Sequence, residues 1–292
     1  MPPRDAPWTT RRLLKWTTDY FTKKTLDSPR LCAEMLLAHV LGVPRLRLYM
    51  DADRPASPGE LSAYRSLIER AANHEPVDYL VGSSPFFSLT FEVSPAVLVP
   101  RPSTETLVEH ILQHARRTPG FRRPILADVG TGSGAIAVTL AKHLPEARVI
   151  ATDINDAALA VARRNAEKHG VSDRIDFRLG SGLDPLGSDR VQVLASNPPY
   201  IPDPEWDDVP LNVKHHEPTH ALRGGVDGLD LLRPLIEGSG EALTSGGQLV
   251  FEHAASHARE LRELAQAQPH LENVYDLPDH ERLPRVLVAE RV

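Results

Sequence analysis

Apolar residues recur with helical spacing in the first part of the chain. Three segments, which open near Thr9, Ser28 and Ser57, place apolar residues three or four positions apart, the pattern of an amphipathic helix. Each opens on a hydroxyl residue that can cap a helix, and Gly42 follows the second segment where a helix end is expected. The pattern therefore predicts a small all-α domain over residues 1–75.

The pattern changes over residues 76–103, which are rich in proline and aromatic residues. Four apolar residues there alternate with polar ones, as in a half-buried strand: Phe87, Leu89, Phe91 and Val93. We expect a β-hairpin that links two domains.

Short β-rich runs alternate with helical segments over residues 104–292. The runs are ILADV, RVIATD, RIDFRL, VQVLAS and QLVFEH. This alternation predicts an α/β domain with a doubly wound parallel sheet, whose ligands bind at the carboxyl ends of the strands. The last twenty residues read as two strands without a helix between them, so we expect a C-terminal antiparallel hairpin.

Composition narrows the possible environments and partners. The 292 residues are 41% hydrophobic, and no stretch resembles a membrane span or the apolar core of a signal peptide, so we expect a soluble cytoplasmic protein with no membrane partner. The one cysteine, Cys32, lies among apolar residues and is expected in a core. A net charge of −6 argues against direct nucleic-acid binding through bulk electrostatics.

A glycine-rich turn follows the first run of the α/β region. The sequence DVGTGSG supplies Gly130, Thr131, Gly132, Ser133 and Gly134 directly before a helical segment. Such glycines let the backbone turn tightly and lie against a ligand, and the helix amides point toward it. The spacing is G-x-G-x-G, which differs from the dinucleotide fingerprint G-x-G-x-x-G.

Two acidic residues flank this turn in sequence. Asp128 precedes the glycines and is expected at the mouth of the loop, where it suits a ligand with positive charge such as S-adenosylmethionine. Asp153 ends the next run, where a carboxylate can accept hydrogen bonds from the two hydroxyls of a ribose. The alternatives are an NAD site, or two acids that only cap the following helices.

The segment NPPY, residues 197–200, follows the run VQVLAS. The Asn197 side-chain oxygen and the Pro198 carbonyl could each accept a hydrogen bond from a planar NH2 group and so orient a poor nitrogen nucleophile. Pro198 and Pro199 stiffen the segment, and Tyr200 offers an aromatic face for a planar group. An ordinary turn is the alternative, because Asn-Pro often starts one.

DVGTGSG with Asp153 resembles motif I and the ribose-binding acid of class I S-adenosylmethionine-dependent methyltransferases. NPPY resembles the [DNS]-PP-[YFW] motif that these enzymes use on a planar nitrogen, either of adenine or of a glutamine amide. The resemblance implies a Rossmann-like fold, S-adenosylmethionine as cofactor and no metal. It also implies catalytic roles for residues 197–200, with cofactor contacts from Asn197 and the glycine turn.

Further segments indicate which nitrogen is methylated. LVPRPSTETLVE and HHEPTHALRGG resemble the HemK/PrmC family of glutamine methyltransferases that act on peptide-chain release factors. This resemblance implies that the glutamine of a Gly-Gly-Gln loop is the acceptor and that the helical domain helps to hold the release factor. Thr104 and Glu105 would lie near the methionine end of the cofactor.

The chain departs from the family where an acidic residue and a bulky one usually contact adenine. Ser181 and Gly182 stand there, so Gly182 becomes the candidate contact. The histidines of HHEPTH lack convincing metal-ligand spacing. Glu252, at the end of a strand, is expected to have a supporting role.

Three other functions remain as alternatives. A methyltransferase for a ribosomal-protein glutamine would be expected to read PRSP where this chain reads PRPS at residues 100–103. An adenine-N6 DNA methyltransferase shares NPPY but would need a basic recognition domain. A binding module without catalysis would keep the fold and the pocket.

Overall fold

The computed structural model describes residues 7–292, which divide into two compact units. The first unit runs to Gly82 and also includes Pro210–His216, with the short helix α9 (Leu211–Lys214). The second unit comprises Ser83–Val209 and Glu217–Val292. The first boundary therefore follows the predicted residue 75 by one short helix, and the linking hairpin belongs to the second unit.

The first unit is helical, as predicted. Its helices are α1 (Thr10–Lys23), α2 (Pro29–Leu41), α3 (Arg47–Met50), α4 (Pro58–Ala72) and α5 (Val77–Val81). Thr9 caps α1 and Ser57 forms a capping box with Glu60, whereas Ser28 adopts a left-handed conformation and makes no capping bond. Cys32 packs against the core of this unit, as expected.

A two-stranded hairpin opens the second unit. Its strands are β1 (Ser83–Phe86) and β2 (Leu89–Glu92). Phe87 and Ser88 have positive φ angles of 47° and 63° and form the turn, so the predicted strand through Phe87 is wrong at its start. Alternation alone missed the turn because a turn residue can also be apolar.

Seven strands form the central sheet in the order β5-β4-β3-β6-β7-β9-β8. They are β3 (Ile125–Val129), β4 (Arg148–Asp153), β5 (Ile175–Leu179), β6 (Val191–Ser196), β7 (Leu243–Glu252), β8 (Leu271–Pro278) and β9 (Pro284–Arg291). β3 to β7 are parallel, and β9 and β8 add the predicted antiparallel hairpin. The α/β prediction is confirmed.

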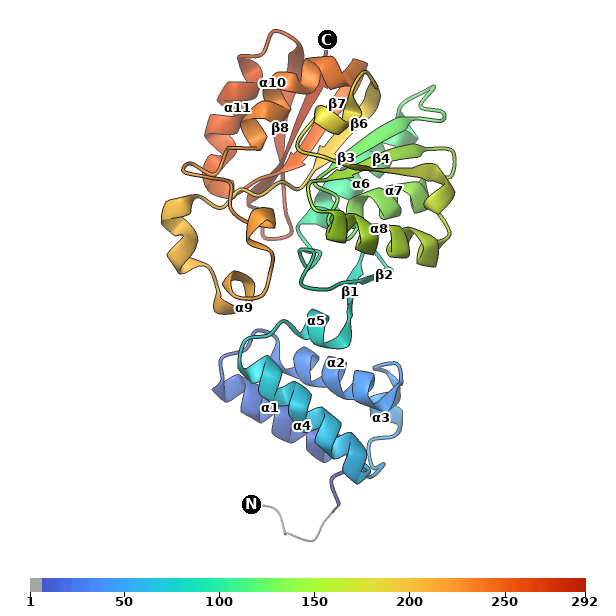
Figure 1. The fold of residues 1–292 in the computed structure, drawn as a ribbon, viewed down its shortest axis with the longest axis vertical. Helices are drawn as coiled ribbons and strands as arrows, with labels where there is room; N and C mark the ends of the chain where they lie inside the picture. The colour runs from blue at the N-terminus through green and yellow to red at the C-terminus, as the bar shows by residue number, and fades with distance from the viewer. Residues whose placement is uncertain (1–6) are drawn as a thin grey trace. The chain divides into compact units, whose positions relative to one another are not determined.

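Helices cover both faces of this sheet (Figure 1). Alternate strand residues enter two core clusters, as Leu126 and Ala127 of β3 illustrate. One cluster includes residues of α6 (Thr104–Arg117), α7 (Ala135–His143) and α8 (Asp156–His169); the other includes residues of α10 (Leu232–Ala242) and α11 (Ala258–Gln266). Burial on both faces explains why the strands read as continuous apolar runs.

The order of the strands places a ligand-binding crevice beside β3. The chain passes from β3 to β4 and β5 on one side and then returns to β6 on the other. In parallel α/β sheets this reversal leaves a crevice at the carboxyl ends of the strands. Short 3-10 helices lie in the connections: η1 (Ser172–Arg174), η2 (Asp184–Leu186), η3 (Asp203–Asp208), η4 (Thr219–Ala221) and η5 (Ala255–His257).

No helix among residues 7–292 combines the length and the apolar character that a membrane crossing would require.

Candidate active site

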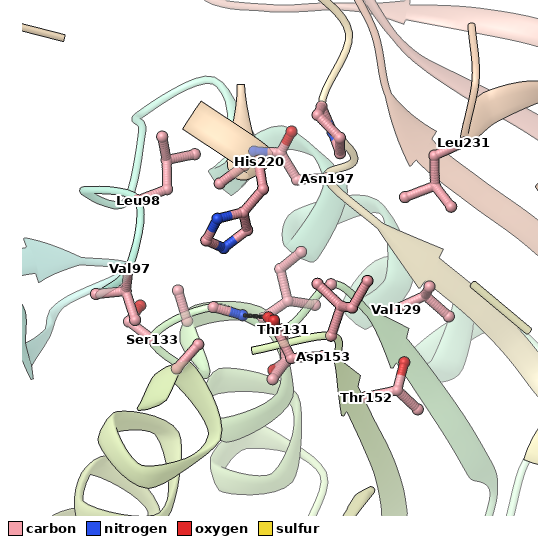
Figure 2. Close-up of a pocket in the computed structure, with 18 of the residues that line it drawn as sticks. Val97, Leu98, Val129, Thr131, Ser133, Thr152, Asp153, Asn197, His220 and Leu231 are labelled. Atoms are coloured by element: carbon pink, nitrogen blue, oxygen red, sulfur yellow. Dashed lines mark hydrogen bonds between the residues drawn. The ribbon is translucent and has the colours of Figure 1, made fainter. Parts of the chain in front are cut away.

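A pocket of about 330 Å³ lies at the carboxyl ends of β3, β4 and β6, within the second unit. This volume is typical of a small-molecule site. Figure 2 draws Asp153, Asn197 and His220 around the same space. The sequence motifs that were separated along the chain therefore meet at one place.

The glycine turn forms one wall of the pocket through residues 130–133. Gly130, Gly132 and Gly134 have φ angles of 75°, 55° and 81°, which residues other than glycine rarely adopt. The amides of Gly130 and Thr131 donate to the Thr152 carbonyl at 2.9 and 2.8 Å, which fixes the loop on β4. A Cβ on Gly134 would come within 3.2 Å of Ala162, so this glycine also permits close packing of α8.

Asp153 lies on the pocket wall at the end of β4. Its Oδ2 accepts a hydrogen bond from the Gly132 amide and its Oδ1 accepts one from the Asn155 amide, both at 2.9 Å. Only 8% of the residue is exposed. Each oxygen keeps a further lone pair, so the carboxylate can still accept bonds from a ligand.

Asp128 occupies a different place from the predicted loop mouth. Strand β3 continues past Asp128 to Val129. Asp128 is fully buried and is not part of the pocket wall. Its Oδ2 accepts bonds from the Thr131 hydroxyl at 2.6 Å and the Ala137 amide at 3.0 Å, so it supports the glycine loop from behind. Desolvation raises the pKa of Asp128 to about 7.

Asn165 on α8 is a support that sequence reasoning missed. Its Nδ2 donates to the carbonyls of Ser133 at 2.9 Å and Glu92 at 3.0 Å, and its Oδ1 accepts from the Glu92 amide at 2.7 Å. The side chain is completely buried. It therefore ties the glycine loop to the hairpin, and the available signal was one amide on an otherwise apolar helix face.

Glu217, from the HHEPTH segment, supports the opposite side of the pocket. The carboxylate accepts a hydrogen bond from the Val99 amide at 3.1 Å and pairs with the Arg101 guanidinium. Val97, Leu98 and Arg101 line the pocket, whereas Glu217 does not. The acid therefore fixes a wall segment from outside.

Asn197 follows β6 directly and lines the pocket together with Pro199. The preceding Ser196 donates to the Val129 carbonyl at 2.7 Å, which joins the ends of β6 and β3. Pro198 and Tyr200 are not part of the pocket wall. Tyr200 packs against the core instead, and burial raises the pKa of its hydroxyl.

A buried carboxylate lies behind NPPY at the end of β7. Glu252 is 0% exposed and accepts hydrogen bonds from Thr104 at 2.6 Å, Ser103 at 3.0 Å and Tyr200 at 3.3 Å. Thr104 lines the pocket and accepts a bond from Asn197 Nδ2 at 3.0 Å. Desolvation raises the pKa of Glu252, and the hydrogen bonds from Thr104, Ser103 and Tyr200 oppose that rise.

The remaining candidates divide between the pocket and other positions. Gly182 has a φ angle of 52° and lines the pocket beside Ser181, and its contact with adenine stays a prediction. Glu105 instead accepts a bond from the Phe87 amide at 2.7 Å in the hairpin and is not part of the pocket wall. His220 lines the pocket, and residues 7–292 contain no group of three side chains placed to hold a metal ion.

Comparisons with known proteins cover almost the whole chain. Residues 12–82 match the family model described as the PrmC N-terminal domain, and residues 102–209 match the methyltransferase small domain. A release factor glutamine methyltransferase of Rhodopirellula baltica is 42% identical over 284 residues, which cover 96% of each chain. The proteins of the same name from Geobacter sulfurreducens and Chlorobaculum tepidum are 43% and 40% identical, over 86% and 98% of each chain.

Proposed function

Because the chain belongs to the release factor glutamine methyltransferase family, we propose that it transfers a methyl group from S-adenosylmethionine to a glutamine of a release factor. The acceptor atom is the side-chain amide nitrogen of the glutamine in the Gly-Gly-Gln loop. The observation that supports this proposal most strongly is that Asn197 and Asp153 line one pocket.

The volume of the pocket and the acceptors on its wall support S-adenosylmethionine as the ligand. The glycines of the turn at residues 130–134 allow its backbone to lie against the ligand, and Asp153 offers acceptors for the ribose hydroxyls. Gly182 and Ser181 line the pocket and are the proposed neighbours of adenine. Asp128 supports the loop from behind through the Thr131 hydroxyl and the Ala137 amide.

The bound cofactor supplies an electrophilic methyl group on a sulfonium. Asn197 does the complementary work on the acceptor, because its Oδ1 can accept one N–H bond from the glutamine amide while its Nδ2 is held by Thr104. This acceptor orients the nitrogen and stabilises the positive charge that develops on it. As the nitrogen bonds to the methyl carbon, the carbon–sulfur bond of the cofactor would break with its electron pair on sulfur, and the nitrogen would release one proton to water, so that charge and atoms balance.

The test offers labelled S-adenosylmethionine with three acceptors in parallel. They are a release factor, the same release factor with its loop glutamine changed to alanine, and duplex DNA. The proposal expects label on the unaltered release factor alone. Label on DNA, or equal label on both release factors, would contradict it.

A further inference from the structure

One buried carboxylate is connected to both ends of the NPPY segment. Glu252 reaches Asn197 through the Thr104 hydroxyl and accepts a direct bond from the Tyr200 hydroxyl. Ser103 donates to the same Oε1 atom as Tyr200. Neither Glu252 nor Tyr200 lines the pocket, so any effect of the carboxylate on the acceptor must pass through other residues.

The hydrogen bonds that join Glu252, Thr104 and Asn197 have a fixed direction. A carboxylate only accepts, so the single proton of Thr104 goes to Oε2 of Glu252 at 2.6 Å. The Thr104 oxygen is then left as an acceptor, which selects the NH2 end of Asn197 at 3.0 Å. The nitrogen and the oxygen of an asparagine amide are told apart by such a network. The carbonyl end of Asn197 therefore points away from Thr104.

The reverse orientation of the amide is costly. A flipped Asn197 would place its oxygen against the Thr104 oxygen, and relief would require the threonine proton to leave Glu252. The loss of one hydrogen bond by a buried charged acceptor is destabilising. The carboxylate therefore favours the orientation of the Asn197 amide that leaves its own bond from Thr104 intact.

We propose that Glu252 is a positioning residue for methyl transfer, acting through Thr104 to hold the Asn197 carbonyl toward the acceptor amide. This inference rests on the proposed function, because it concerns the same acceptor site. Glu252, at the end of β7, would thus act on the orientation of Asn197 and not on cofactor binding.

The Thr104→Val variant tests the series of hydrogen bonds from Glu252 to Asn197, because it removes the hydroxyl and keeps the shape of the side chain. We expect kcat to fall by about 10–100-fold while the cofactor Kd changes by less than about twofold, because orientation acts on the chemical step. Thr104→Ser restores the hydroxyl and should recover most of kcat. Thr139→Val is the matched control, since this threonine is buried and its hydroxyl has no partner among residues 7–292.

Glu252→Gln tests the direction of the bonds. The new amide keeps its oxygen toward Ser103 and Tyr200, where it retains two bonds, and turns its NH2 toward Thr104. The threonine proton is then released toward Asn197, and the preferred orientation reverses. We expect a loss of kcat of about tenfold or more in the wild-type background and no further loss in the Thr104→Val background.

Two kinetic results would overturn the proposal. One is a Thr104→Val protein with wild-type kcat; the other is a Glu252→Gln effect of equal size in both backgrounds, which would indicate an independent structural role. A separate measurement needs no acceptor: hydrogen exchange of the Asn197 NH2 group by NMR, identified by its loss in Asn197→Ala. Faster exchange in Thr104→Val supports the hydrogen-bond series from Glu252 to Asn197, and unchanged exchange contradicts it. This result does not depend on whether the proposed substrate is correct.

Discussion

The Oδ2 atom of Asp153 lies 2.9 Å from the backbone nitrogen of Gly132. This bond joins the acid at the end of β4 to the glycine loop after β3, so the two predicted cofactor motifs form one unit. The shape of the loop and the direction of the carboxylate depend on each other.

Asp153→Asn is expected to weaken cofactor binding by about 10–100-fold. The new NH2 group must face one of the two backbone N–H donors, and one oxygen that could accept a hydrogen bond from the ligand is lost. Isothermal titration with S-adenosylmethionine measures the change. Asp156→Asn is the control, since this neighbouring carboxylate is exposed at the start of α8. Equal affinities for the wild type and Asp153→Asn would show that the acid does not serve the ligand.

Asn197→Ala is expected to lower kcat by about 10²–10³-fold, because it removes an oriented acceptor for the developing positive charge. Cofactor affinity should remain close to that of the wild type. Single-turnover transfer and equilibrium binding separate the two effects. A large loss of cofactor affinity with little change in the transfer rate would assign Asn197 to the cofactor instead.

Asn165→Ala is expected to lower the free energy of unfolding by about 2–4 kcal/mol, because three buried hydrogen bonds lose one partner. Urea denaturation measures the loss. Glu167→Ala, an exposed change on the same helix, should alter stability by less than about 0.5 kcal/mol. Similar losses of stability in the two variants would show that Asn165 does not support the glycine loop.

The pH dependence of stability should carry a signature of Asp128. Burial raises its pKa from 3.8 to about 7, so the folded protein binds a proton that the unfolded chain has already released. The stability that this residue contributes is complete below the unfolded value and is lost as the pH rises through about 7.

Comparison with Asp128→Asn isolates this contribution. From about pH 8 to about pH 5 the wild type should gain roughly 2–3 kcal/mol of unfolding free energy relative to the variant. Urea denaturation of both proteins at the two pH values measures the difference. A difference that stays constant, or that moves the other way, would mean that Asp128 is ionised throughout.

The sequence predicted the elements whose signals are local. The helical domain, the parallel strands and the C-terminal hairpin follow from periodicity and caps, and the glycine turn follows from residues that tolerate positive φ. The hairpin turn at Phe87 and Ser88 was missed because the apolar Phe87 continues the alternating pattern of the strand that follows it. The short helix α9 gave no periodic signal over its four residues.

The supports of the site could not be predicted in the same way. Asn165, Glu217 and Glu252 lie 73, 118 and 148 residues from a partner along the chain, so only the fold brings each pair together. Asp128 was placed on the correct loop but on the wrong side of it, because one further strand residue decides whether its side chain reaches the pocket.

In the proposed reaction a release-factor glutamine is the acceptor. The most direct measurement is peptide mass spectrometry of a release factor after incubation with the enzyme and S-adenosylmethionine. We expect the added mass of one methyl group on the glutamine of the Gly-Gly-Gln loop. This added mass should be absent when the Asn197→Ala variant replaces the wild-type enzyme. A methyl group on any other residue, or an unmodified loop after complete cofactor turnover, would contradict it.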